Sequence, residues 1–286
     1  MNPTSKKTLF VSDLDGTLLR SDGTLSEHSR SSLTELVSAG VHFTVASART
    51  WSEITPLLKG VPLRLPVIAV NGAFLTDFAT GRPLLVNHLA ADLAGTIYEE
   101  ILEADLLPFI CGFDGQSDKL YYRDLANDEM RWFHGILMIH SRHRLCHTND
   151  LREVLSQQVV SFAVMGPQEK IDRLAGRLAA EYPGRLENFH FQNPYTPGHW
   201  WLTIHDAAAC KSKALRELAD LYDFRMENIV VFGDQLNDLR MFRTAGRAVA
   251  VANAEPALKS HADEIIGPNE EDAVVNYIRN RTCQCR

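Results

Sequence analysis

Short and almost wholly apolar runs are the feature that most constrains how this chain can fold. Four of them stand out, at residues 41–46, 66–70, 229–232 and 248–252. A strand without a polar face has to be buried on both sides, as strands are in a parallel sheet that is covered by helices. Runs this short do not cross a bilayer, which takes about 20 apolar residues. The pattern therefore predicts an α/β protein with a doubly wound, mostly parallel sheet.

Helical patterns separate these runs. Residues 27–39 place Leu33, Leu36 and Val37 on one side of a helix, and Gly40 is a plausible stop. A second helical pattern, at 214–222, follows Lys211. Two further strands are expected at Thr8–Ser12 and Trp201–Ile204.

The segment between residues 84 and 199 has a different texture. Aromatic residues, histidines and single arginines are denser there, the expected strands alternate, and helical stretches at 90–104 and 169–181 separate them. At roughly 150 residues per domain, 286 residues fit two domains. We expect a core made of residues 1–83 and 200–286 and an inserted α+β domain at 84–199. The connections, near 81–84 and 193–198, are rich in Asn, Pro and Gly and could act as a hinge.

Charge and termini exclude several classes of protein. The 29 Lys and Arg residues against 36 Asp and Glu give a net charge of −7, which argues against nucleic acid or an anionic membrane as a partner. The first nine residues lack the apolar core of a secretory signal, so a cytoplasmic location is expected. Five scattered cysteines suit reduced thiols, and we assign no role to Cys283 or Cys285 in the tail.

Two carboxylates come directly after the first expected strand, in Asp13-Leu14-Asp15-Gly16-Thr17. In an extended segment residues two apart face the same side, so Asp13 and Asp15 would project together at the carboxyl end of a parallel strand. Such neighbours need a cation, or one of them must keep its proton. A polar turn is the plain alternative. A calcium loop of the helix–loop–helix kind is excluded, because it needs Gly and Glu at the positions of Leu18 and Thr24.

A second acidic group follows the run at 229–232, in Gly233-Asp234-Gln235-Leu236-Asn237-Asp238. If a helix opens near Gln235, Asp234 and Asp238 lie about one turn apart and face one site. Helix capping by Asp234 alone would leave Asn237 and Asp238 without a role. Clustered carboxylates at strand ends form an oxygen-lined site, and Mg²⁺ is its natural occupant.

A phosphate would also need positive and hydrogen-bonding partners. Ser47-Ala48-Arg49 follows the run at 41–46 and offers a hydroxyl and backbone N–H groups near an expected helix start. Lys211 begins the helical pattern after residue 210. A lysine in a first helical turn opposes the helix dipole, which favours a functional reason for it.

Taken in order, these motifs resemble those of the haloacid dehalogenase (HAD) superfamily. The matching residues are Asp13, Asp15, Gly16, Thr17, Ser47, Lys211, Asp234, Asn237 and Asp238. Asn71-Gly72-Ala73 and the large insert that follows resemble, more narrowly, the Cof-type branch with a C2B cap. The resemblance covers nearly the whole chain and departs from the branch at Ser47-Ala48-Arg49, where Thr-Gly-Arg is usual. Serine keeps the hydroxyl, whereas Ala48 could restrict a backbone that glycine leaves free.

The resemblance implies a Rossmann-like core and a set of roles. Asp13 would attack phosphorus, Asp15 would act as acid and then base, and Ser47 and Lys211 would neutralise the transferred phosphoryl group. Mg²⁺ would be held by Asp13, the backbone carbonyl of Asp15, and Asp234, with Asp238 and Asn237 ordering the metal site. The expected substrate-binding residues are Gly16, Arg49, Asn71, Gly72 and Asn237.

The function expected from this resemblance is Mg²⁺-dependent hydrolysis of small phosphorylated metabolites, with sugar phosphates as one class. A phosphotransferase or phosphomutase, and a ligand-binding protein with a vestigial catalytic set, stay open as alternatives. A basic cluster in the insert has three open interpretations: a solvated polar face, contact with an acidic part of the substrate, or a zinc site using His140, His143, Cys146 and His147. Its other members are Arg131, His134, Arg142 and Arg144.

Overall fold

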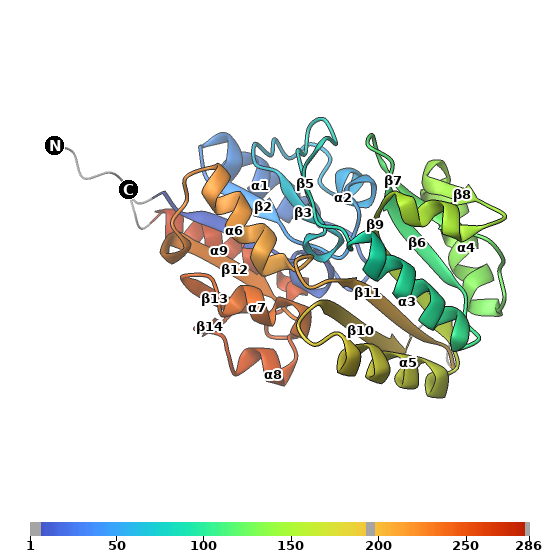
Figure 1. Ribbon diagram of the computed structural model, residues 1–286. Coiled ribbons are helices and arrows are strands. Elements are labelled where there is room, and N and C mark those ends of the chain that lie inside the picture. The colour runs from blue at the N-terminus through green and yellow to red at the C-terminus, as the bar shows by residue number, and fades with distance from the viewer. Residues whose placement is uncertain (1–6, 193–197, 284–286) are drawn as a thin grey trace. The chain divides into compact units, whose positions relative to one another are not determined.

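The computed structural model describes residues 7–192 and 198–283. Two compact units make up the chain. The first unit combines Met1–Leu85 with Cys210–Arg286, and the second unit is Val86–Ala209. Their elements are labelled in Figure 1.

A parallel sheet forms the centre of the first unit, in the order β14-β13-β12-β1-β2. Every residue of β1 and β12 is buried, as the apolar runs predict for strands covered on both faces. In the register, Ser12 at the end of β1 lies between Val45 and Phe232. The bounds are β1 Leu9–Ser12, β2 His42–Val45, β12 Ile229–Gly233, β13 Arg247–Ala250 and β14 Glu264–Ile265.

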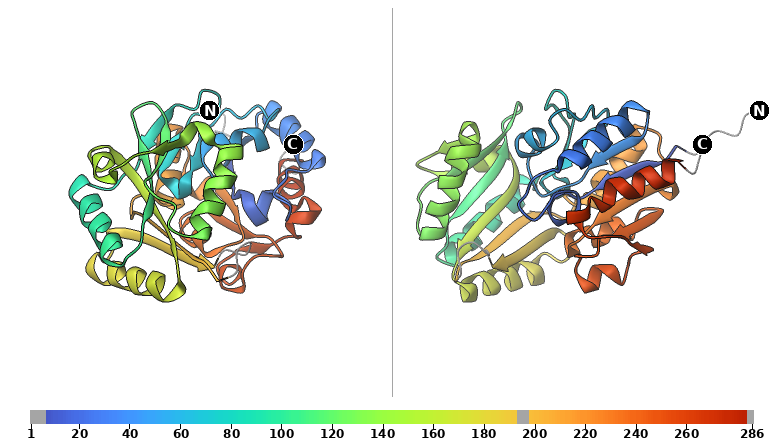
Figure 2. Two further views of the ribbon diagram at one scale, coloured as in Figure 1. Left: turned by 90° about the vertical axis from the view of Figure 1, so that its right-hand side faces the viewer. Right: turned by 180° about the vertical axis from the view of Figure 1, so that it is seen from behind.

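Helices cover both faces of this sheet. One face carries α6 and α7 (Figure 1), and the other carries α1 and α9, which lie side by side in Figure 2. The sequence explains the ends of α1, because Ser26 accepts a hydrogen bond from the N–H of Ser29 at its start and Gly40 has φ +92° just beyond its end. The bounds are α1 Glu27–Ser38, α2 Trp51–Leu57, α6 Lys211–Leu221, α7 Leu239–Phe242, α8 Pro256–Lys259 and α9 Ala273–Cys283.

A small antiparallel sheet continues the first unit beyond β2. A parallel bridge joins Ala46 to Ile68, and from there the strands run in the order β3-β4-β5. Their bounds are β3 Val67–Ala69, β4 Phe74–Thr76 and β5 Pro83–Val86.

The second unit is a six-stranded sheet in the order β10-β11-β9-β6-β7-β8, antiparallel except for the β7–β8 pair. Helices α3 and α5 pack on one face over an apolar core that includes Ile97, Phe162 and Leu178. Helix α4 packs on the other face, where the Phe133 ring lies 5.3 Å from Phe109. The bounds are α3 Ala91–Glu103, β6 Pro108–Phe113, β7 Asp118–Tyr122, α4 Asp128–His140, β8 Leu145–His147, β9 Gln158–Gly166, α5 Gln168–Glu181, β10 Leu186–Gln192 and β11 Trp200–Asp206.

One strand belongs to a different unit from the one the sequence suggested. We expected Trp201–Ile204 in the core, but β11 pairs with β9 and β10 in the second sheet. Its side chains alternate, with Leu202 and Ile204 in the apolar core and Trp201 only half-buried, as a strand with one covered face requires. The units therefore meet along the chain at 85/86 and 209/210, not at 83/84 and 199/200.

Other expectations concern the connections, the membrane and the thiols. The second connection expected near 193–198 falls largely on residues 193–197, which lie outside the described residues. Across the described ranges, no helix is both long and apolar enough to span a membrane. The thiols of Cys111, Cys146, Cys210 and Cys283 are free, and Cys285 lies outside the described residues.

Candidate active site

Polar residues follow three adjacent strands at one edge of the parallel sheet. Asp13 follows β1, Ser47 comes two residues after β2, and Asp234 follows β12. Because these strands are parallel, their carboxyl ends share an edge. Backbone hydrogen bonds fix this register past the strand ends, from the Asp13 N–H to Phe232 and from the Ala46 N–H to Ser12.

Three buried carboxylates converge at this edge. Ligand oxygens of Asp13, Asp234 and Asp238 all lie within 4.8 Å of one another, which confirms that these motifs meet in space. Burial raises the pKa of Asp13 well above its ordinary value, the Lys211 ammonium opposes that shift, and the charge of Asp238 adds to it. Burial also raises the pKa of Asp234, against a hydrogen bond from Thr17. The cluster thus concentrates negative charge where water is scarce.

Lys211 supplies the positive charge inside this cluster. Its ammonium lies 2.6 Å from an oxygen of Asp13 and 2.7 Å from one of Asp238, and its side chain is only 1% exposed. Burial lowers the pKa of Lys211, but the two carboxylates raise it by more, so the pKa stands above its ordinary value. The amine therefore stays protonated. The unfavourable place of a lysine in the first turn of α6 is explained by these two ion pairs.

Asp238 binds Lys211 and also holds the second acidic loop in place. While one carboxylate oxygen accepts from Lys211, the other accepts from the backbone N–H groups of Asp234 and Gln235 at 3.2 and 3.4 Å. The expected helical turn is present, as a 3₁₀ turn at Leu236–Asp238 that leads into α7. Capping by Asp234 alone does not describe this loop, because Asp238 is the residue whose side chain accepts from the turn.

Glycines allow the acidic loops to approach so closely. A Cβ on Gly16 would lie 2.3 Å from Oδ2 of Asp234, and one on Gly233 would lie 2.4 Å from Oδ2 of Asp238. Gly16 also has φ +73°, a conformation that side chains disfavour. Thr17, beside it, donates a 2.9 Å hydrogen bond to Asp234. The sequence motif contained Thr17, but its partner 217 residues away could not be deduced from spacing.

Asp15 does not join the three carboxylates. Its side chain is half exposed and accepts two hydrogen bonds from Arg49, at 2.8 and 2.7 Å. Strand alternation does not apply to it, because β1 ends at Ser12 and residues 14–18 form an irregular turn with an extended Asp15 and a left-handed Gly16. We expected its carboxylate to project together with that of Asp13, and it is not part of the group that Asp13 forms with Asp234 and Asp238; the expectation that the backbone carbonyl of Asp15 holds the metal is a separate one and stays a prediction. Arg49, which we expected at the substrate, binds Asp15, and this bond raises the pKa of Arg49; its contact with a substrate stays a prediction.

Ser47, Asn71 and Asn237 form a second, neutral side of the edge. Ser47 is buried, its hydroxyl accepts from the Arg49 N–H at 3.1 Å, and its carbonyl accepts from the Asn71 N–H at 2.9 Å. The Asn237 amide donates to Asn71 at 3.4 Å. The helix start that we expected beside Ser47 lies further on, because α2 begins at Trp51.

The chain is left-handed over three residues beside Ser47, with φ of +50° at Val70, +53° at Asn71 and +97° at Gly72. Such strain persists only where surrounding contacts enforce it, and it concentrates at functional sites. A Cβ on Gly72 would lie 2.4 Å from the backbone of Cys210, so glycine lets this turn approach the residue before Lys211. Ala48 is not among the residues with positive φ, so alanine restricts nothing at that position.

Arg131, Arg142, His143 and His147 of the basic cluster are exposed, as a solvated polar face requires, and other members have partners within the second unit. Arg144 is buried and ion-paired with Asp118 at 2.5 Å, Arg131 pairs with Asp128, and His134 contacts the Tyr122 hydroxyl at 3.1 Å. Among side chains that the structure describes, only Asp13, Asp234 and Asp238 gather three potential metal ligands. His143, Cys146 and His147 therefore make no such group, and the side chain of His140 lies outside the description.

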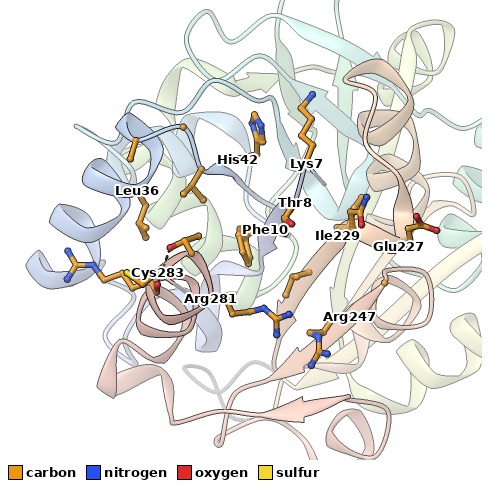
Figure 3. Close-up of a pocket in the computed structure, with 18 of the residues that line it drawn as sticks. Lys7, Thr8, Phe10, Leu36, His42, Glu227, Ile229, Arg247, Arg281 and Cys283 are labelled. Carbon is orange, nitrogen blue, oxygen red and sulfur yellow. Dashed lines mark hydrogen bonds between the residues drawn. The ribbon is translucent and has the colours of Figure 1, made fainter. Parts of the chain in front are cut away.

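A hollow of about 1150 Å³ lies at the other edge of the parallel sheet (Figure 3). Its lining includes Lys7, His42 and Arg247, at the amino ends of β1, β2 and β13. It contains none of the residues that the motifs single out. The residues of the motifs therefore lie at the carboxyl edge and not in this hollow.

Comparison with known proteins gives a consistent result. Residues 10–278 match the family of haloacid dehalogenase-like hydrolases. The chain is 26% identical over 283 residues to a 5-amino-6-(5-phospho-D-ribitylamino)uracil phosphatase of Bacillus subtilis, covering 96% of this chain and 97% of that one. It is also 26% identical to the pyridoxal phosphate phosphatase of Escherichia coli, over 93% and 95% of the two chains.

The fold is shared with solved structures. A protein of Thermotoga maritima is 28% identical to this chain and superposes on it with a TM-score of 0.77. The match covers 96% of this chain and 97% of the Thermotoga maritima chain. Likeness over both units, and not the first alone, accounts for that coverage.

Proposed function

The chain belongs to the haloacid dehalogenase-like hydrolase family, and from that premise we propose that it is a Mg²⁺-dependent phosphatase of small phosphorylated metabolites. The observation that carries the proposal is the buried group of Asp13, Asp234 and Asp238 with Lys211 inside it. The buried ammonium of Lys211 holds the Asp13 carboxylate in place for attack on phosphorus, in line with the leaving group. Its positive charge also offsets the negative charge that the phosphate adds to a site with several carboxylates. The names of the two curated relatives, both phosphatases, support the reaction class.

Asp13 is the proposed nucleophile. One of its oxygens forms a bond to phosphorus while the bond from phosphorus to the leaving oxygen breaks, which gives an aspartyl phosphate. Lys211 orients Asp13 through the 2.6 Å ion pair and places positive charge next to the phosphoryl oxygens. Ser47, at the neighbouring strand end, is the proposed hydroxyl partner of the same group.

Asp15 is the proposed acid and base. It donates a proton to the leaving oxygen in the first step, and in the second it accepts a proton from the water that attacks phosphorus. That water releases inorganic phosphate and restores Asp13. Asp15 stays a carboxylate between the two steps, so that it can act as the base, and its half-exposed position gives the attacking water access to it. The role proposed for Arg49 is to aim this carboxylate.

The residues present fit a magnesium ion. Three carboxylates supply hard oxygen donors, and burial, together with the charge of Asp238, raises the pKa of Asp13 and of Asp234, a shift that a bound cation would oppose. Asp13 and Asp234 would hold the ion together with the backbone carbonyl of Asp15, while Asp238 would order the site. When bound, Mg²⁺ would neutralise charge on the transferred phosphoryl group.

Substrate contacts stay proposals. Asn71, Gly72 and Asn237 lie at the same edge as Ser47, and sugar phosphates are the class that we propose to test first. The sequence-based expectations of a cytoplasmic location and of no nucleic-acid or membrane partner stay predictions.

The test is phosphate release from a panel of sugar phosphates, nucleotides, cofactor phosphates and simple aryl phosphates. We expect Asp13→Asn to lose at least about a thousandfold in kcat, as removal of a nucleophile does, while its circular dichroism and melting temperature match wild type. Residual activity within tenfold of wild type would overturn the nucleophile assignment. An isomeric phosphate formed without phosphate release would show a mutase in place of a hydrolase.

Metal dependence is tested separately. EDTA should abolish turnover and added Mg²⁺ should restore it, because three crowded carboxylates repel an incoming phosphate without a cation. Turnover that is indifferent to EDTA would remove magnesium from the proposal.

A further inference from the structure

We propose that Asn253, supported by Asn269, is a positioning residue that holds the catalytic loop carrying Asp15. This inference rests on the proposed function, because it assigns a purpose to the geometry of its acid and base. Neither residue lies in any of the family motifs, and both are more than 230 residues from the loop in sequence.

The Asn253 side chain bonds at both ends. Its amide nitrogen donates to the carbonyl of Gly16 at 2.7 Å, and its oxygen accepts from the backbone N–H of Asn269 at 3.0 Å. A carbonyl only accepts and a backbone N–H only donates, so these two partners fix which end of the amide is which. The Asn253 side chain therefore links the Gly16 carbonyl to the N–H of Asn269, and these two partners allow only one orientation of its amide.

Asn269 extends the same contact along the loop. It is 5% exposed, and its amide donates to the carbonyl of Leu19 at 2.8 Å. Further on, the Glu270 carboxylate accepts from the Ser21 N–H at 2.7 Å, and Asp272 accepts from the Ser29 hydroxyl at 2.8 Å. Residues 253, 269, 270 and 272 thus contact residues 16, 19, 21 and 29, in the same order along the chain. We call Asn253 together with Asn269–Asp272 the clasp.

The loop needs an external support of this kind. Residues 14–18 belong to no sheet, and the Leu19 N–H closes their turn by donating to the carbonyl of Leu14. Asp15 is extended, with ψ 125°, whereas Gly16 is left-handed, with φ +73°. The backbone conformation therefore changes sharply between these two residues. A glycine has no side chain to pack, and its carbonyl is the group through which the clasp can set its orientation.

Gly16 lies between the two residues of the loop to which we assign a role at the site. The residue before it is Asp15, the proposed acid and base, and the residue after it is Thr17, which donates to Asp234. A rotation of the Gly16 peptide would therefore move a catalytic carboxylate on one side and a partner of the metal-capable cluster on the other. Asn253 opposes that rotation.

The experiment compares two phosphate esters of similar shape and different leaving groups, p-nitrophenyl phosphate and phenyl phosphate. Nitrophenolate leaves readily without a proton, whereas phenolate depends on the general acid. For Asn253→Ala we expect kcat/KM on phenyl phosphate to fall by on the order of tenfold to a hundredfold, and that on p-nitrophenyl phosphate to fall by clearly less. A merely structural defect would lower both equally.

Two further variants secure the interpretation. Asn253→Asp keeps the size of the side chain but turns an oxygen toward the Gly16 carbonyl, so it should show the same selective loss without a change in packing. Asn127→Ala is the matched control, because the Asn127 amide also bonds at both ends, donating to the carbonyl of Met165 at 2.9 Å and accepting from the N–H of Met130 at 2.9 Å, in the second unit. It should match wild type on both esters.

The outcomes separate this inference from the proposed function. A wild-type enzyme that releases no phosphate from any ester contradicts the proposed function, and the role of Asn253 falls with it. A wild type that is active, an Asn253→Ala variant that is folded, and an unchanged ratio between the two esters would overturn the positioning role alone. So would an equal change of that ratio in Asn127→Ala.

Discussion

Lys211 shows at the scale of one residue how this site reconciles opposing demands. A fully buried ammonium is costly, yet two carboxylates at 2.6 and 2.7 Å raise its pKa and keep it charged. Its backbone is placed by a close approach, since Gly72 lies against the residue just before it. The position of this charge therefore depends on a residue without a side chain.

Gly72→Ala should show this dependence. The new Cβ would lie 2.4 Å from the carbonyl of Cys210 and 2.9 Å from the Lys211 nitrogen, so α6 has to shift and Lys211 with it. We expect kcat to fall by on the order of a hundredfold and the free energy of unfolding to fall by more than the about 1–2 kcal/mol that a left-handed alanine costs. Enzyme assays and urea titrations measure the two effects.

Gly60→Ala is the control for this variant. Gly60 has a similar φ of +92°, but nothing lies within 4 Å of the position that a Cβ would take there. Gly60→Ala should lose only the unfolding free energy that a left-handed alanine costs, and it should keep wild-type kcat. Equal losses of activity in the two variants would show that backbone strain, and not the contact with Cys210, is what matters.

At the scale of elements, β11 decides where the second unit ends. It pairs with β10 on one side and β9 on the other, and it contributes Leu202 and Ile204 to the apolar core. A boundary at residue 199, as the composition suggested, would remove this strand from the middle of its sheet. The unpaired strand edges and the exposed core would then favour aggregation.

Two fragments test the assignment of β11. Residues 86–209 contain every member of the second core and should fold alone, with a cooperative thermal transition in circular dichroism. Residues 84–199 lack β11 and should show no such transition. Cooperative melting of the shorter fragment would mean that β11 is dispensable for the second unit.

At the scale of the whole molecule, a buried histidine links stability to pH. His205 on β11 is 3% exposed, and burial lowers its pKa from 6.5 to about 4. The unfolded chain therefore binds this proton at a higher pH than the folded chain does. Stability from His205 is complete above the unfolded pKa and is lost as the pH falls from 6.5 toward 4.

His205→Phe should remove this part of the pH dependence. Between pH 7 and pH 4 we expect the wild type to lose about 3 kcal/mol more unfolding free energy than the variant. Urea titrations followed by tryptophan fluorescence suit the measurement, since three of the four tryptophans, Trp132, Trp200 and Trp201, lie in the second unit. His190→Phe, on the neighbouring strand, is the control with an exposed ring. Parallel pH profiles for wild type and His205→Phe would contradict this account.

The sequence by itself determined the parallel sheet, its helices α1 and α6, and the meeting of Asp13, Asp234 and Asp238. It could do so because burial on both faces leaves a local signature in composition, and because the carboxyl ends of parallel strands share an edge. Ser47 and Lys211 were candidates from their own positions after a strand and at a helix start, and the family resemblance added only the roles expected of them. All these inferences need only local patterns and one rule of topology.

The tertiary structure alone decided which partner each side chain takes. Asp15 binds Arg49 and not the carboxylate cluster, β11 belongs to the second unit, and Asn253 supports Gly16 from 237 residues away. None of these has a periodicity or a spacing, because each is a contact between segments that are distant in the chain. Such contacts depend on how irregular loops and whole elements pack, and local composition does not encode that packing.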